Sequence, residues 1–69
     1  MTQQDTTEMV YSYIEKYQQE NGGVSPSQRE IGRACFLAQS SVRYHLAKLQ
    51  GLGRIAYGKG KARHIVLLN

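Results

Sequence analysis

Several features that would mark other classes of protein are scarce or missing in this sequence. Its 69 residues include a single cysteine, Cys35, so no disulfide can form within the chain and a reducing, cytoplasmic location is expected. One cysteine and two histidines, His45 and His64, are too few and too scattered for a zinc site, and we expect no metal or cofactor. The longest aliphatic run, residues 65–68, is too short to span a bilayer. Residues 1–5 have neither a basic start nor an apolar stretch, so no secretory signal is expected.

Acidic residues are absent from more than half of the chain. Residues 1–30 hold all five carboxylates against two cations, a net charge of −3. Residues 31–69 hold seven cations and no acid, a net charge of +7. Such a segment attracts polyanions, either nucleic acid or an anionic membrane surface, whereas ordinary solubilising charge is the plain alternative.

The composition indicates one small folded domain covering residues 1–69. Hydrophobic residues make up 41% of the chain and charged residues 20%, which is typical of globular proteins and not of disordered ones. At this length a scaffold with a shielded cleft has little room, and no nucleophile constellation is visible. We therefore expect no enzymatic activity and no small-molecule substrate.

An amphipathic helix is predicted at the start of the chain, ending near Glu20. Asp5 and Glu8 have the spacing of a capping box, and residues 21–23 (NGG) tolerate the left-handed backbone that ends a helix. Tyr11 falls on another face and is expected at the surface. The inward stripe is predicted from apolar residues at helical intervals: Met9, Val10, Tyr13, Ile14 and Tyr17.

A short second helix is predicted through about Cys35. Pro26 holds the preceding residue in an extended conformation, and Ser27 and Glu30 then form a second capping box. A compact turn at residues 36–38 follows, in which Phe36 is expected to fill the core. The inward residues of this helix are predicted to be Ile31, Ala34 and Cys35.

A third helix is predicted from Gln39 to about Gly51. Its inward stripe is Val42, Leu46 and Leu49, spaced four and then three residues apart. His45 adjoins this stripe and is expected to be a packed, hydrogen-bonded histidine and not a ligand.

Two strand-like runs, residues 54–57 and 64–68, close the chain around a glycine-rich basic loop. The order of elements predicts a mainly α fold with a small β-hairpin: a winged helix-turn-helix of three helices plus a two- to three-stranded antiparallel wing. In such a fold the second helix braces the third, which can then protrude into the major groove of DNA.

The candidate interface begins with the outward face of the third helix. An arginine can bind guanine O6 and N7 with two bonds, a glutamine can bind adenine in the same way, and hydroxyls suit phosphates or base edges. A solvated helix face is the alternative. The candidate residues on this face are Gln39, Ser40, Ser41, Arg43, Tyr44 and Lys48.

The loop between the strands supplies the second part of the interface. Lys59, Lys61 and Arg63 are spaced by two and share one side of an extended chain, which suits a row of phosphates. Protection of a sheet edge against aggregation is the alternative. Ser27 could donate to a phosphate at the start of its helix, although capping explains it equally well.

These segments together resemble the N-terminal DNA-binding domain of the LexA repressor family. The resemblance rests on residues 25–31 (SPSQREI), Phe36, residues 45–49 (HLAKL), residues 53–55 (GRI) and residues 63–68 (RHIVLL). Family members repress transcription by binding operator DNA, usually as dimers on two half-sites. The resemblance therefore implies double-stranded DNA as the partner, with a homodimer on DNA.

Two departures from the family limit what the resemblance implies. Arg43 and Tyr44 stand where family members often carry acidic residues, so we expect a different operator sequence. The family's self-cleaving domain, with its serine–lysine dyad, has no room in 69 residues. The chain is expected to be an excised domain or a small stand-alone regulator.

The resulting hypothesis is sequence-specific binding of double-stranded DNA by a transcriptional regulator, a LexA-like repressor or its DNA-binding domain. The third helix would enter the major groove and the basic wing would lie on the backbone, which places the protein on the nucleoid when it is bound. The alternative is a winged-helix module that docks an acidic protein partner. RNA is less favoured because its A-form major groove does not admit a helix.

Overall fold

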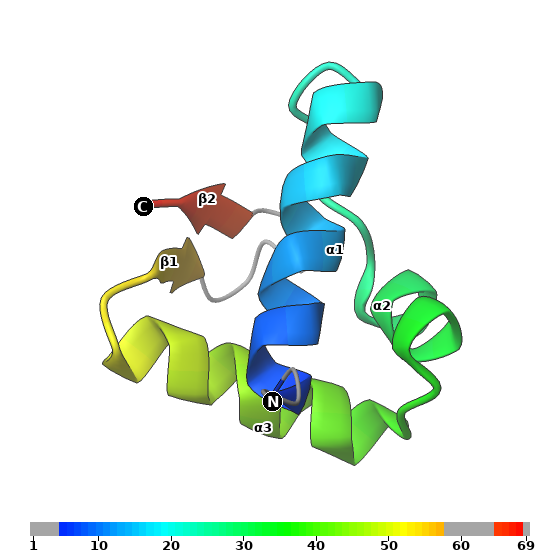
Figure 1. The fold of residues 1–69 in the computed structure, drawn as a ribbon, viewed down its shortest axis with the longest axis vertical. Coiled ribbons are helices and arrows are strands. Elements are labelled where there is room, and N and C mark those ends of the chain that lie inside the picture. The colour runs from blue at the N-terminus through cyan, green and yellow to red at the C-terminus, as the bar shows by residue number, and fades with distance from the viewer. Residues whose placement is uncertain (1–4, 58–64, 69) are drawn as a thin grey trace, which may run out of the picture.

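Three helices are followed by a short antiparallel hairpin. The computed structural model describes residues 5–57 and 65–68. The elements are α1 (Thr6–Glu20), α2 (Gln28–Cys35), α3 (Gln39–Gly51), β1 (Ile55–Tyr57) and β2 (Ile65–Leu67). Figure 1 shows α1 lying across α3, with α2 on one side of α1 and the hairpin on the other. This mainly helical arrangement confirms the predicted winged helix-turn-helix.

Among the described residues the hairpin is a sheet of two strands, which agrees with the predicted two to three. Ile55 pairs with Leu67, and Ala56 pairs with Val66. Ile55 and Ile65 are buried while Ala56 and Val66 are exposed, so one face of the hairpin covers the helices. This is the alternation expected from the period of two along a strand.

The core takes one face from every element. The stripe predicted for α3 is confirmed, since Val42, Leu46 and Leu49 are each 1% exposed or less. Removing these apolar groups from water is the main force that holds the three helices together. The buried apolar residues are Val10, Tyr11, Ile14, Ile31, Cys35, Val42, Leu46, Leu49, Ile55 and Ile65.

The stripe predicted for α1 is partly wrong. Met9 is 37% exposed, whereas Tyr11 is buried beneath the guanidinium of Arg54, which lies 4.2 Å from the ring centroid. The contact with Arg54, in the segment before β1, adds Tyr11 to the buried face of α1. Asp5 stands at the N-cap as predicted, but its side chain makes no capping hydrogen bond.

The capping box of α2 and its end at Cys35 are confirmed, but two of the residues predicted to face inward do not. The backbone N–H of Ser27 donates to Glu30 Oε1 at 2.7 Å, and the N–H of Glu30 donates to Ser27 Oγ at 3.1 Å. Ala34 is exposed, and Phe36 is 92% exposed instead of filling the core. Phe36 has left-handed backbone angles that reverse the chain, so Leu37 packs against the core in its place.

Candidate nucleic-acid interface

The outward face of α3 carries most of the predicted interface residues together. Burial of its apolar stripe turns the opposite side of the helix to solvent, because positions three and four apart share a face. Tyr44 is 61% exposed and Ser41 is half-buried. The remaining candidates on this helix are exposed: Gln39, Ser40, Arg43 and Lys48.

The first turn of α3 has no side-chain cap. Ala38 occupies the N-cap, and the first helical hydrogen bond runs from Val42 N–H to the Ala38 carbonyl at 3.0 Å. The amide groups before Val42 therefore precede the first intrahelical bond, as at any helix N-terminus. Combined with the cations along α3, these amides favour an anionic partner.

The exposed ring of Tyr44 packs against His45, which makes a partly buried contact with α1. His45 Nδ1 lies 2.8 Å from Thr7 Oγ1, and Thr7 is 1% exposed on α1. The His45 ring meets the Tyr44 ring edge-on, with centroids 5.1 Å apart. The prediction that His45 is packed and hydrogen-bonded is confirmed, and its ring links the core to the outward face of α3.

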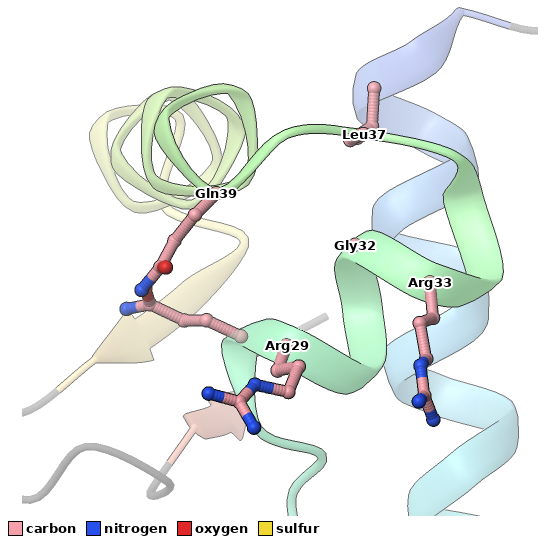
Figure 2. A pocket seen from close by; sticks show the side chains of 6 residues that line it. Arg29, Gly32, Arg33, Leu37 and Gln39 are labelled. Carbon is pink, nitrogen blue, oxygen red and sulfur yellow. The ribbon is translucent and has the colours of Figure 1, made fainter.

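A hollow of about 260 Å³ lies between α2 and the beginning of α3. Figure 2 shows Arg29 and Arg33 extending from α2 and Gln39 extending from the first turn of α3. Gly32 and Leu37 form part of its wall, and Gln28 also lines it. Two cations of α2 and one candidate residue of α3 therefore line the same hollow.

Sequence reasoning did not single out Arg29 and Arg33. Their spacing of four residues on the helix that precedes the turn is the signal that would have found them, since it places both side chains on one face. Arg29 was not recognised because it lies in residues 1–30, a segment whose net charge is negative. Packing of α2 against α3 places the two arginines and Gln39 around the same hollow.

The cations of this surface are not used in ion pairs with the carboxylates that the structure describes. Within residues 5–57 and 65–68, the ion pair found joins Arg54 to Glu8. That hydrogen bond raises the pKa of Arg54, so this arginine serves the fold. Arg29, Arg33, Arg43 and Lys48 make no such pair, so their charge faces solvent.

The base of the wing is tied to the helical body by hydrogen bonds. The Ser25 hydroxyl donates to the Ile65 carbonyl at 3.1 Å and accepts from the Ile65 N–H at 2.9 Å. Gln18 Nε2 donates to the same carbonyl at 2.7 Å and to Ser25 Oγ at 3.0 Å. The wing candidates Lys59, Lys61 and Arg63 lie outside the described residues.

Ser27 is half-buried at the start of α2. Its hydroxyl oxygen accepts the capping bond, which leaves the hydroxyl proton for another acceptor. The capping role is therefore confirmed, and a phosphate contact stays a prediction.

Other kinds of site receive no support from the described part of the chain. There, no three His, Cys, Asp or Glu side chains gather in a way that could hold a metal ion. None of its helices is long and apolar enough to cross a membrane. Cys35 is buried, as predicted, and burial raises the pKa of its thiol.

A short helix bracing a second helix across a tight turn, with a β-hairpin following, defines the winged helix-turn-helix class. Residues 2–64 match the family model of the LexA DNA binding domain. This chain belongs to that family, which confirms the resemblance drawn from the sequence.

Named relatives agree with this assignment. The chain is 44% identical over 61 residues to the LexA repressors of Listeria welshimeri serovar 6b, Listeria monocytogenes serotype 4a and Listeria innocua serovar 6a. The match covers 87% of this chain and 29% of each relative. The chain therefore spans less than a third of the length of these relatives.

Proposed function

We propose that this chain binds double-stranded DNA in a sequence-specific manner and serves transcriptional repression. The observation that carries the proposal is the outward face of α3, which presents Gln39, Arg43 and Lys48 to solvent and contains no acid. A helix of this kind fits the major groove, where each base pair presents a distinct pattern of donors and acceptors. The role proposed for these residues is binding, not catalysis.

Each part of the surface has a separate task in this proposal. Arg43 and Gln39 read base edges, since guanidinium and amide groups can each make two bonds to a purine. Ser40, Ser41 and Tyr44 contact base edges or phosphates, and Lys48 contacts the phosphate backbone.

Contacts to the backbone orient the domain on the duplex. Arg29, Arg33 and Ser27 of the α2 region lie on one stretch of phosphates, because the first helix of a helix-turn-helix crosses the backbone. A second stretch is held by the cations of the wing: Lys59, Lys61 and Arg63.

Repression as a dimer on DNA is part of the proposal. The relatives are named LexA repressors, which supports this role for the chain. A dimer would place two copies on half-sites about 34–36 Å apart, one turn of the double helix. A single copy on one half-site would bind weakly.

The test is a selection from random duplex DNA, followed by fluorescence anisotropy of the selected site and a shuffled control over a range of salt concentrations. We expect tight binding of the selected site and a steep loss of affinity with salt. Salt-dependent binding of both duplexes with equal affinity would replace the proposal with a non-specific role. No binding at low salt would favour a module that docks an acidic protein.

Arg43→Ala tests the assignment of base reading to α3. We expect its affinity for the selected site to fall by roughly 5- to 150-fold, the value of about 1–3 kcal/mol for a lost bidentate contact, with a much smaller loss on shuffled DNA. Lys16→Ala, an exposed cation on α1, is the matched control and should change neither affinity. Equal losses on both duplexes would make Arg43 a phosphate contact.

A further inference from the structure

Phe36, in the turn between α2 and α3, is unusual in two independent ways. Its side chain is 92% exposed, the largest fraction among the exposed large apolar residues that the structure describes. Its backbone has φ 58° and ψ 47°, which is the left-handed region, and no other described non-glycine residue has a positive φ. Bulky side chains rarely adopt these angles.

Both features are unfavourable in the free, folded domain. The left-handed conformation brings the Cβ of a non-glycine residue too close to the following carbonyl, and a helix that ends in this way usually has glycine there. An exposed phenylalanine ring also loses the stabilisation that burial would give. Residues held in strained backbone conformations cluster at sites where a binding partner is contacted.

The position of Phe36 indicates which partner. It lies two residues before Ala38, the N-cap of α3, and the first residues of such a helix are those that meet base edges. Leu37, which Figure 2 shows on the turn after α2, packs against the core, while the side chain of Phe36 remains in solvent.

The charge around Phe36 favours a polyanion with apolar features. Arg33, three residues earlier, and Gln39, three residues later, are both exposed. No carboxylate occurs anywhere in residues 31–69. Duplex DNA offers phosphates for the cation and, in the major groove, thymine methyl groups for an aromatic ring.

We infer that Phe36 is a specificity-determining residue that packs its ring against a thymine 5-methyl group where α3 enters the major groove. The inference rests on the proposed function and extends it, because it adds an apolar contact from the turn to the polar contacts of α3. The strained turn holds the ring out of the core, so the ring is presented before DNA arrives.

The experiment combines a variant of the protein with a variant of the DNA. Phe36→Gly removes the ring and suits the backbone angles, so its Tm should be unchanged or up to about 5 °C higher than that of the parent chain. Its affinity for the selected duplex should nevertheless fall about 10-fold or more, since the buried area of the ring is lost.

Uracil replaces each thymine of the selected duplex in turn, which deletes one methyl group and nothing else. With the parent chain, we expect one uracil position near the start of α3 to weaken binding about fourfold, the value of one buried methyl group. With Phe36→Gly, the same substitution should have no effect. Phe36→Leu retains apolar contact and should keep part of the sensitivity to uracil.

The outcomes separate this inference from the proposed function. If the parent chain prefers its selected duplex but Phe36→Gly binds equally tightly, or keeps the same response to uracil, the inference is overturned and the proposed function stands. If the parent chain has no preferred duplex, both are overturned. Self-association without DNA that disappears in Phe36→Gly would assign the ring to a protein contact and overturn the inference.

Discussion

At the scale of single residues, the lack of a side chain at Gly32 lets the turn after α2 lie close to the helix. A Cβ at this position would lie 2.7 Å from the Leu37 carbonyl oxygen and 3.5 Å from Val42 Cγ2. The first contact is with backbone and cannot be relieved by rotating a side chain. The Leu37 N–H in turn donates to the Gly32 carbonyl at 2.9 Å, so a hydrogen bond holds the turn against the end of α2.

Gly32→Ala should therefore destabilise the domain even though alanine favours helices. We expect a loss of about 1–3 kcal/mol, the usual cost of overpacking, and a Tm lower by about 4–8 °C for each kcal/mol. Gly51→Ala, at the open end of α3, has nothing within 4 Å of the new Cβ and is the matched control. Its Tm should be equal or higher. Thermal denaturation followed by circular dichroism measures both, and equal Tm values for Gly32→Ala and the parent would contradict the packing argument.

At the scale of elements, the hairpin is held by a network of hydrogen bonds that no local sequence pattern predicts. Ser25 lies in the segment between α1 and α2, yet its hydroxyl bonds both backbone groups of Ile65, forty residues later. Ser25 is 5% exposed, so these bonds form away from water. They connect the wing to the helical body at the first residue of β2.

Ser25→Ala should loosen the wing. The variant leaves the buried N–H of Ile65 without its acceptor, which costs about 1–3 kcal/mol of unfolding free energy. Amide hydrogen exchange should show faster exchange at Ile65 than at Leu46 in α3. Ser12→Ala, an exposed serine on α1, is the control and should stay within about 0.5 kcal/mol of the parent. An Ile65 amide with unchanged protection would show that the strand is held by other bonds.

At the scale of the whole molecule, charge is divided between an acidic first part and an acid-free remainder. Glu8 on α1 forms an ion pair with Arg54, and the guanidinium of Arg54 also lies over the ring of Tyr11. These two charges therefore stabilise the fold. The exposed cations of α2 and α3 have no such partner among the described carboxylates. The surface formed by α2 and α3 therefore has a positive electrostatic potential, which attracts an anionic partner.

Salt dependence measures how many of these cations meet phosphates. Each cation that contacts a phosphate adds about 0.9 to the slope of log affinity against log salt concentration. We expect Arg29→Ala, Arg33→Ala, Lys59→Ala and Lys61→Ala each to flatten the slope by about one unit on the selected and shuffled duplexes alike. Lys16→Ala should leave the slope unchanged. If neither lysine variant changes the slope of log affinity against log salt concentration, the wing does not contact phosphates.

The sequence by itself determined the order of elements, the apolar stripe of α3 and the capping box at Ser27. These features depend on the spacing of apolar residues and on pairs of residues within one helical turn of each other. Both can be read directly from the sequence. It also indicated the family, and it predicted which side of α3 faces solvent, because one buried stripe leaves the opposite side of a helix exposed. Their individual contacts with DNA stay predictions.

Only the tertiary structure decided the rest. Tyr11 is buried because it joins the core cluster and Arg54 covers its ring, and Phe36 is exposed because the turn takes left-handed angles and Leu37 packs against the core instead. The pairing of Ser25 with Ile65 joins segments far apart in the chain. For Tyr11 and Ser25 the deciding neighbour comes from another part of the chain, and for Phe36 it is the backbone conformation of the turn, so no local periodicity contains these features.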